Sequence, residues 1–287
     1  MSALEGKVAV VTGGNSGIGK EAAIGIARQG AQIVVAARNP QKAAAAVTEI
    51  TERAGAAGRV EAMPIDLASF ASVRAFAAAY ADKFDRLDIL LNNAGLVLRK
   101  RELTVDGHET QFQVNHLSHF LLTSLLRDLL VASAPARVVN VSSDAHTAAR
   151  NGLDFDDLEW ANRRYGGFRV YSATKLMNIY FTRELAKRED PAVITANAVH
   201  PGFVASNFGK EGDMGMFGNI VMPLLRPFAL SQEKGALTSI YVATSPEVAD
   251  LTGCFFAKSR VTTPSTAALD DAAAARLWEI SEKLTSA

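Results

Sequence analysis

The sequence predicts an α/β fold in which one doubly wound parallel sheet carries helices on both faces. Two observations lead to this prediction. Short apolar runs of strand character alternate with longer helical patterns along all 287 residues. The first apolar run is followed by a glycine-rich turn and then immediately by a helix. Because crossovers between parallel strands are right-handed, strands that alternate with helices place those helices on both faces of the sheet.

The composition excludes several classes of protein. Thirty basic and thirty acidic residues give a formal net charge of zero, and no long run of like charge indicates a nucleic-acid partner. The single Cys254 cannot form an intrachain disulfide, and the N-terminal residues lack the pattern of a signal peptide. No apolar run approaches the ~20 residues that span a bilayer. We therefore expect a cytoplasmic protein without a membrane anchor.

The first strand, Val8–Val11, leads into a turn that contains Gly13, Gly17 and Gly19, and a helix follows to Ala27. The N-terminus of a helix offers unpaired N–H groups and the positive end of a dipole, and glycines let a pyrophosphate approach the backbone. Such a turn can also be only a tight turn. Its place at the start of the β-α alternation favours a nucleotide cofactor. The predicted contacts are Gly13, Asn15, Ser16, Gly17, Ile18 and Gly19.

The end of the second strand, Gln32–Ala37, indicates which cofactor binds. In sites of this design an acid ~20 residues after the glycines binds the ribose 2′-OH, whereas an arginine suits a 2′-phosphate. This strand ends in Ala37 and Arg38, with no acid. NADP(H) is therefore predicted, with NAD(H) less favoured. The alternative is that Arg38 is an ordinary solvated arginine.

The third strand, Arg59–Pro64, is followed by Asp66 and Leu67 at its carboxyl end, where ligands bind in open α/β sheets. Asp66 could bind the adenine amino group, or it could cap the helix that begins near Ser69. The residues alone leave both roles open. Both Asp66 and Leu67 are taken as candidate cofactor contacts.

The fourth strand, Leu87–Leu91, runs into small and amide residues. Asn93, Ala94 and Gly95 would let the backbone pass close beneath a flat ligand, and they are predicted cofactor contacts.

A long helical pattern from about Gly107 to Val131 contains Asn115, His116 and His119. The two histidines, three residues apart, could face one metal ion, but no third ligand recurs nearby. We interpret them as polar helix residues and predict no metal site.

The remaining elements complete the alternation. The expected segments are a strand at Arg137–Val141 that delivers Ser142 and Ser143, a helix at Phe168–Arg188, a strand at Val193–Val199 before Pro201 and Gly202, a helix near Gln232–Thr244, a strand at Gly253–Phe256 and a terminal helix from about Thr266. Together these elements predict a single Rossmann-like domain over residues 1–287. Its cofactor-binding part covers roughly 1–150, and its catalytic and substrate part roughly 140–287.

The segment Ser206–Leu230 breaks the pattern with glycine, methionine, phenylalanine and two prolines. Flexible apolar side chains between glycines suit a mobile cover over an apolar site. The alternatives are a permanently packed segment or a contact between subunits.

Tyr171 and Lys175 have a spacing that suits proton transfer. Residues at i and i+4 share one face of a helix, so the phenol and the ammonium would point into the same cleft. An ordinary tyrosine has a pKa near 10 and is about one part in a thousand ionised at neutral pH. A nearby positive charge favours the phenolate and makes tyrosine a usable general acid or base.

With these features in this order, the chain resembles the short-chain dehydrogenase/reductase family over essentially its whole length. The matching motifs are Thr12-Gly13-(x3)-Gly17-Ile18-Gly19, Asn92-Asn93-Ala94-Gly95, Asn115, Ser143, Tyr171-(x3)-Lys175 and Pro201-Gly202. The resemblance implies that Ser143 hydrogen-bonds the substrate oxygen and that Tyr171 exchanges a proton with it. It implies that Lys175 binds the nicotinamide ribose and lowers the pKa of the tyrosine, and that Asn115 holds a water in the proton relay. It also makes Tyr171, Lys175, Pro201, Gly202 and Val204 cofactor contacts.

Two features depart from the commonest pattern of the family. Ser143 and Tyr171 lie 28 residues apart, about twice the usual spacing, and the extra length holds the acidic stretch Asp154–Trp160. This stretch could be an inert surface loop. The insertion, Ala37-Arg38, Tyr241–Glu247 and the ending Leu277–Leu284 nevertheless look like the retinol dehydrogenase and WW-domain oxidoreductase branch. We expect no counterpart of the N-terminal membrane anchor of many animal retinol dehydrogenases or of the WW modules, and Ser206 stands where the family has threonine. A retinoid substrate therefore does not follow from the resemblance.

The sequence therefore predicts an NADP(H)-dependent oxidoreductase that moves a hydride between nicotinamide and a small apolar aldehyde or ketone, or the corresponding alcohol. The alternative is a catalytically silent NADPH-binding regulatory protein, because a fold does not fix a function. Sugar-nucleotide epimerisation would need a larger C-terminal substrate region. A homodimer or homotetramer is possible on the same resemblance.

Overall fold

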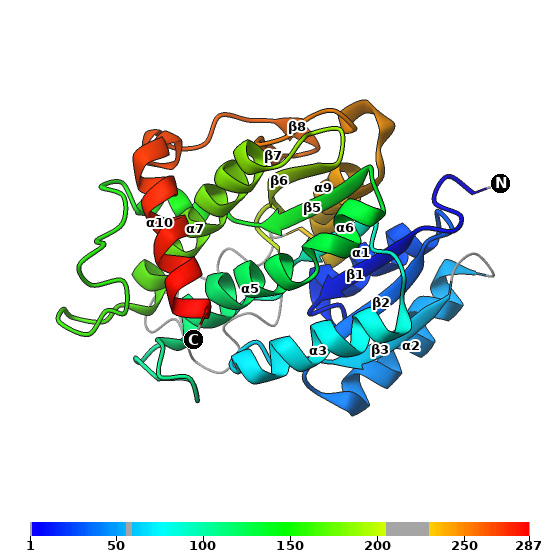
Figure 1. Cartoon of the computed structure of the whole chain (residues 1–287), viewed down its shortest axis with the longest axis horizontal. Helices are drawn as coiled ribbons and strands as arrows, with labels where there is room; N and C mark the ends of the chain where they lie inside the picture. The colour runs from blue at the N-terminus through cyan, green and yellow to red at the C-terminus, as the bar shows by residue number, and fades with distance from the viewer. Residues whose placement is uncertain (1, 56–58, 205–229, 287) are drawn as a thin grey trace.

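The computed structural model describes residues 2–55, 59–204 and 230–286, and its strands form one eight-stranded sheet (Figure 1). The strands are β1 (Val8–Thr12), β2 (Gln32–Ala37), β3 (Val60–Pro64), β4 (Ile89–Asn92), β5 (Ala136–Val141), β6 (Ile194–His200), β7 (Phe255–Ala257) and β8 (Arg260–Val261). Their order is β3-β2-β1-β4-β5-β6-β7-β8. Neighbours from β3 through β7 are parallel, and β8 alone is antiparallel to β7.

Helices cover both faces of this sheet. They are α1 (Gly17–Ala27), α2 (Pro40–Ala54), α3 (Phe70–Lys83), α4 (Thr110–Phe112), α5 (Ser118–Leu125), α6 (Arg127–Ala132), α7 (Gly167–Arg188), α9 (Gln232–Thr244) and α10 (Asp271–Thr285). One hydrophobic core joins the sheet to α1, α2 and α9, and the other joins it to α3, α5, α7 and α10. Alternate residues of β1 enter opposite cores, because successive side chains of a strand point to opposite faces. The predicted doubly wound Rossmann-like fold is confirmed.

The C-terminal helix closes one of these cores. In α10, the ring of Trp278 packs on Phe120 of α5 and Phe181 of α7, with ring centroids 4.8 and 5.9 Å apart. The guanidinium of Arg188 lies 4.5 Å from the Trp278 ring centroid. α10 thus lies along α7 (Figure 1) and ties the end of the chain to the middle of the fold.

The site is positioned by the order of the strands. The chain leaves β1 in one direction and resumes at β4 on its other side, which opens a crevice at the carboxyl ends of these two strands. Predicted site residues follow successive strands at this edge: Gly13 after β1, Arg38 after β2, Asp66 after β3, Asn93 after β4, Ser143 after β5 and Pro201 after β6.

The long helix predicted from Gly107 to Val131 is interrupted in the structure. It consists of α4, a π-helical stretch at Gln113–Leu117, α5 and α6, with a break at Leu126. The terminal helix is likewise preceded by a separate 3-10 turn at Thr266–Leu269, and Asp270 caps α10 by accepting a hydrogen bond from the Ala273 N–H at 2.9 Å. Strand β8 was not predicted, because its two exposed residues carry no apolar run.

Within the described parts of the chain, no helix combines the length and the apolar character that crossing a bilayer requires. The predicted cover, Ser206–Leu230, lies outside the described residues except for Leu230. The N–H of Leu230 donates to the carbonyl of Phe203 at 2.7 Å, and Val204 forms a parallel bridge with Leu230.

Candidate active site

The glycine turn packs directly against the loop after β4. The Oγ1 of Thr12, the last residue of β1, accepts hydrogen bonds from the N–H groups of Asn93 at 2.9 Å and Ala94 at 3.0 Å. Gly13 has φ +65°, and a Cβ placed there would lie 3.2 Å from Ala94 Cα. A Cβ on Gly19 would overlap the Asn93 amide. These glycines are therefore needed for the close approach of the two loops, whatever else they bind.

The N-terminus of α1 is suited to an anion. Ser16 is its N-cap residue in extended conformation, and its side chain makes no capping hydrogen bond. Gly17 has φ +58°, and a Cβ built there would meet no atom within 4 Å. Unpaired N–H groups at such an end, together with the helix dipole, attract phosphate. The residues present thus fit the pyrophosphate of a dinucleotide.

Arg38 and Asp66 lie near each other at the next two strand ends. The Arg38 side chain is 73% exposed, and its Nη1 lies 3.9 Å from Asp66 Oδ1. Asp66 does not cap α3: Ser69 Oγ accepts the Ser72 N–H at 3.3 Å, whereas Asp66 Oδ1 accepts the Ala68 N–H at 3.0 Å and shapes the preceding turn. The side chain of Leu67 is buried.

The structure brings Ser143, Tyr171 and Lys175 together. Ser143 lies two residues after the end of β5; its hydroxyl accepts the Ala145 N–H at 3.1 Å and lies close enough to the Tyr171 hydroxyl to act on its pKa. One turn along α7 from Tyr171, the Lys175 Nζ lies 5.4 Å from the centroid of the tyrosine ring and donates to the Val141 carbonyl at 2.9 Å. The neighbouring Ser142 points elsewhere, because its buried Oγ donates to the Lys175 carbonyl at 2.7 Å.

Burial sets the protonation states of Tyr171 and Lys175. It raises the pKa of Tyr171 to about 12, and the Ser143 hydrogen bond acts in the opposite direction. Burial lowers the pKa of Lys175 to about 8. The pKa of the tyrosine is thus shifted upward by desolvation of the phenolate, opposite to the expected lowering by the lysine. At neutral pH the tyrosine hydroxyl keeps its proton and is poised as a donor.

Asn115 holds the loop after β4 rather than projecting a spare polar group. Its Nδ2 donates to the Leu96 carbonyl at 3.0 Å and to Thr174 Oγ1 at 3.1 Å, and its Oδ1 accepts the Leu96 N–H at 2.8 Å. Both amide hydrogens are thereby used. If Asn115 holds a water, it therefore does so as an acceptor, through its main-chain carbonyl or the remaining lone pair of Oδ1. That carbonyl lies in the π-helical stretch, 3.3 Å from His119 Nδ1.

Gly95 separates this amide from the lysine. A Cβ on Gly95 would lie 3.3 Å from Asn115 Oδ1 and 3.5 Å from Lys175 Nζ. Only a residue without a side chain leaves the space between these two polar groups open.

His116 and His119 face different parts of the fold. His119 Nε2 lies 3.0 Å from Thr12 Oγ1 beside the glycine turn, whereas His116 Nε2 lies 2.8 Å from Ser281 Oγ in α10. Burial lowers the pKa of His119 to about 4 and that of His116 to about 3. Among the described residues, no three His, Cys, Asp or Glu side chains gather as a metal site would require.

The insertion between Ser143 and Tyr171 is anchored and is not a detached loop. Glu159 accepts the N–H of Glu109 at 2.6 Å and contacts His108 Nδ1 at 2.7 Å. Tyr165 donates its hydroxyl to the buried Glu109 carboxylate at 2.8 Å. Burial raises the pKa of Glu109. This network joins the insertion to the segment that leads into α4.

Trp160 of the insertion is 8% exposed and has φ +52°. The guanidinium of Arg163 lies 3.6 Å from its ring centroid, a cation–π contact.

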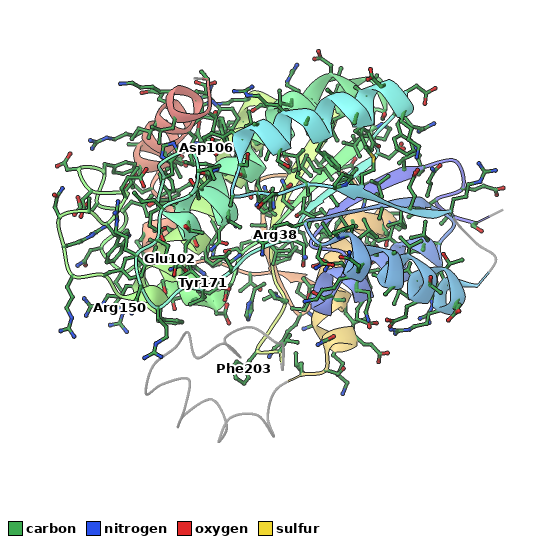
Figure 2. The ribbon with its side chains drawn as sticks, turned by 90° about the horizontal axis from the view of Figure 1, so that it is seen from below. Arg38, Glu102, Asp106, Arg150, Tyr171 and Phe203 are labelled. Atoms are coloured by element: carbon green, nitrogen blue, oxygen red, sulfur yellow. The ribbon has the colours of Figure 1, made fainter. Side chains whose placement is uncertain are left out.

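Two exposed phenylalanines follow elements of the site, and one of them lies beside the tyrosine. Phe168, one turn before Tyr171 in α7, is 44% exposed, and the two ring centroids are 6.4 Å apart. Phe203, which is 40% exposed, follows the turn at Pro201 and Gly202, where Gly202 has φ +86°. Figure 2 labels Tyr171, Phe203 and Arg38, which come from three separate elements of the chain.

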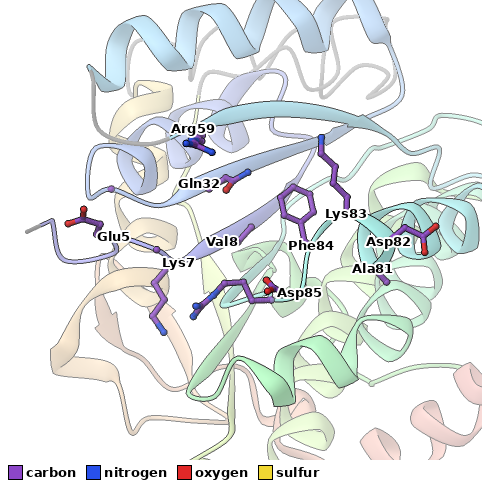
Figure 3. A pocket seen from close by; sticks show the side chains of 13 residues that line it. Glu5, Lys7, Val8, Gln32, Arg59, Ala81, Asp82, Lys83, Phe84 and Asp85 are labelled. Carbon is purple, nitrogen blue, oxygen red and sulfur yellow. The ribbon is translucent and has the colours of Figure 1, made fainter.

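A hollow lies at the opposite edge of the sheet (Figure 3). Its lining includes Lys7, Gln32, Arg59 and Arg86, which stand at the amino-terminal ends of β1 to β4, and none of the predicted site residues. Lys7 and Arg86 both pair with the buried Asp88, at 2.9 and 2.7 Å. These charges hold the fold at the edge remote from Tyr171.

The chain belongs to the short-chain dehydrogenase family. The family model described as short chain dehydrogenase matches residues 7–154. Members of this family are NAD(P)-dependent oxidoreductases, and the eight-stranded sheet described above is of the same type.

The chain is similar to retinol dehydrogenases and to the WW domain-containing oxidoreductase. The chain is 40% identical to human retinol dehydrogenase 13 over 98% of its own length and 85% of that protein. It is 42% identical to the human WW domain-containing oxidoreductase, over 97% of its own length and 68% of that protein. Among solved structures, the RhlG/NADP active-site complex of Pseudomonas aeruginosa is 30% identical with a TM-score of 0.69, covering 88% of this chain and 94% of that one.

Proposed function

We propose that this protein is an NADP(H)-dependent oxidoreductase that interconverts an apolar aldehyde or ketone and the corresponding alcohol. The observation that carries the proposal is the side-chain interaction of Ser143 with the Tyr171 hydroxyl, together with the Lys175 ammonium beside the same ring. The exposed rings of Phe168, beside Tyr171, and of Phe203, shortly after β6, favour an apolar substrate. The solved relative with bound NADP supports the choice of cofactor.

The cofactor would lie along the carboxyl edge of the sheet. The uncapped N-terminus of α1 would hold the pyrophosphate, and Arg38 would hold the 2′-phosphate. Asn93–Gly95 and Pro201–Val204 would flank the nicotinamide half. When bound, the nicotinamide supplies the hydride for the carbonyl carbon or accepts it from the alcohol.

The chain's own groups then handle the substrate oxygen. Ser143 donates a hydrogen bond to it and fixes its position. For carbonyl reduction, Tyr171 passes its phenolic proton to that oxygen, and a pKa raised by burial keeps this proton in place at neutral pH. The Lys175 ammonium offsets the charge of the phenolate that remains. In alcohol oxidation the same proton moves in the opposite direction.

Tyr171→Phe tests the proposal, because it removes only the proton-exchanging hydroxyl. We expect kcat to fall below a few per cent of wild type for NADPH oxidation with a panel of apolar aldehydes, while the NADPH Kd measured by calorimetry changes less than about threefold. Tyr241→Phe is the matched control, since that hydroxyl contacts Glu247 near the end of α9. Substantial turnover by Tyr171→Phe would contradict the role of this tyrosine. NADPH binding by wild type without turnover of any aldehyde, ketone or secondary alcohol would indicate a silent regulator instead.

A further inference from the structure

One peptide unit beside the catalytic serine is held by two histidines. The carbonyl of Ser143 lies 2.7 Å from Nδ1 of His146, and the N–H of Asp144 donates to Nδ1 of His200 at 3.2 Å. Carbonyl and N–H belong to the same planar unit, so both of its polar groups are bound by side chains. His200 is also the last residue of β6, directly before Pro201 and Gly202. His200 therefore links the segment after β5 to the loop expected at the nicotinamide, whereas His146 links that segment to Ser265.

The hydrogen-bond partners fix the proton on each ring. Nε2 of His146 accepts the Ser265 N–H at 3.0 Å, so its Nδ1 carries the hydrogen that is donated to Ser143. His200 has the opposite tautomer: Nδ1 accepts from Asp144, and Nε2 lies 2.9 Å from the Asp144 carboxylate. Both rings make these contacts as neutral imidazoles. The His146 ring is 1% exposed and packs edge-on to Phe255 at 5.1 Å between centroids.

We propose that His146 and His200 are positioning residues that orient Ser143 toward Tyr171, and that they do so only while both imidazoles are neutral. A proton added to His200 Nδ1 would face the Asp144 N–H, and a proton added to His146 Nε2 would face the Ser265 N–H. The first event sets two donors against each other at the peptide unit itself, and the second does so at Ser265, which frees the His146 ring from its second anchor. The inference rests on the proposed function, because it assigns these residues to the serine of that site.

The charges around the pair favour the neutral forms at neutral pH. Three groups face His200: the Asp144 carboxylate, which raises its pKa, and His146 and Lys258, which lower it. For His146, Asp144 and the Ser143 carbonyl raise the pKa. Burial is the largest cause for both, and the pKa of each histidine is lowered. Orientation of Ser143 should therefore be intact at neutral pH and lost on acidification.

The tautomers can be measured without any turnover. Two-bond ¹H–¹⁵N spectra of the whole protein labelled with ¹⁵N-histidine would report which ring nitrogen carries hydrogen in each of the five histidines. Spectra of His146→Asn and His200→Asn assign the two signals. At pH 7.5 we expect hydrogen on Nδ1 of His146 and on Nε2 of His200. A charged imidazolium, or the other tautomer, at either position would overturn the proposal even in a protein that shows no activity.

Kinetics test the consequence for catalysis. Asparagine can replace each contact to the peptide unit, because its Nδ2 can donate to the Ser143 carbonyl and its Oδ1 can accept from the Asp144 N–H, whereas leucine can do neither. We expect His146→Leu and His200→Leu to lose about tenfold in kcat with the NADPH Kd changed less than about twofold, and the asparagine variants to stay within about threefold of wild type. Leucine variants as active as wild type, or asparagine variants as impaired as leucine, would overturn the proposal.

The pH profile separates positioning from mere structural support. Wild type should lose kcat as pH falls below the ordinary histidine pKa of about 6.5. In His200→Asn, the loss of kcat at low pH that comes from protonation of His200 should be absent. In Asp144→Asn, the loss of kcat should occur at lower pH than in wild type, since the carboxylate raises the pKa of His200. An acid limb unchanged in both variants would refute the titration. If wild type itself turns over no substrate, the proposed function fails while the tautomer result still stands.

Discussion

Replacement of Arg38 by leucine should weaken NADPH binding and leave NADH binding unchanged. The guanidinium is 73% exposed, and its nearest carboxylate oxygen, on Asp66, lies 3.9 Å away. An exposed pair at that separation contributes about 0–1 kcal/mol, so removing Arg38 should cost the fold little. A charge-assisted contact with a 2′-phosphate is worth about 1.5–3 kcal/mol, which corresponds to about 10- to 150-fold in affinity.

Calorimetric titration of NADPH and NADH into wild type and Arg38→Leu measures this difference directly. Arg59→Leu is the matched control, because that arginine lines the hollow at the opposite edge of the sheet. Asp66→Asn is a second test, because it removes the carboxylate that competes with the 2′-phosphate for Arg38. This change should tighten NADPH binding up to about fivefold in the protein that has Arg38, and should not tighten it in Arg38→Leu. Equal NADPH affinity in wild type and Arg38→Leu would refute the contact and return Arg38 to the role of a solvated surface residue.

Three further predictions, made with four variants, test the site. Ser143→Ala should lower kcat at least ~100-fold, the scale of one lost preorganised donor. Ser142→Ala should lose mainly stability, because the hydroxyl of Ser142 donates to the Lys175 carbonyl. A larger loss of kcat in Ser142→Ala than in Ser143→Ala would exchange their roles. Asn115→Ala should lower the free energy of unfolding in urea by about 2–4 kcal/mol, since the three hydrogen bonds of this buried side chain to Leu96 and Thr174 are lost. A free energy of unfolding equal to that of wild type would contradict this. Because burial lowers the pKa of Lys175 to about 8, the unfolded chain binds the extra proton between pH 8 and 10.5, so stability rises with pH across that window. Lys175→Met should remove this rise and be about 1–3 kcal/mol more stable at pH 7, and a less stable variant would argue against the lowered pKa.

The architecture was predictable because its signals are local. The apolar runs at Val8–Val11 and Gln32–Ala37 form the expected strands, and the glycine turn between them begins a helix at the expected place. The π-helical stretch around Asn115 was not predictable in this way. Its backbone departs from the 3.6-residue period on which helix patterns depend, and its side-chain partners, Leu96 and Thr174, lie 19 and 59 residues away.

The same distinction between local and long-range signals holds for the candidate site. Ser143, Tyr171 and Lys175 could be found by spacing and resemblance, because each lies at a strand end or on one helix face. The contacts of His146 to Ser265 and of His200 to Asp144 join residues 119 and 56 positions apart, and no local pattern marks them. The Glu159–Glu109 contact spans 50 positions and was likewise invisible in the sequence. Such contacts depend on the assembled fold, so the structure was needed to find them.

The chain has two tryptophans, Trp160 and Trp278, and they stand in separate surroundings. Trp160 is stacked with Arg163 inside the insertion, and Trp278 is packed between Phe120 and Phe181 where the C-terminal helix meets the fold. Each is therefore a natural fluorescent reporter of one region. Single-tryptophan forms made with Trp160→Phe or Trp278→Phe would show, by the order of their emission changes in denaturant, whether the insertion loosens before the body of the protein melts.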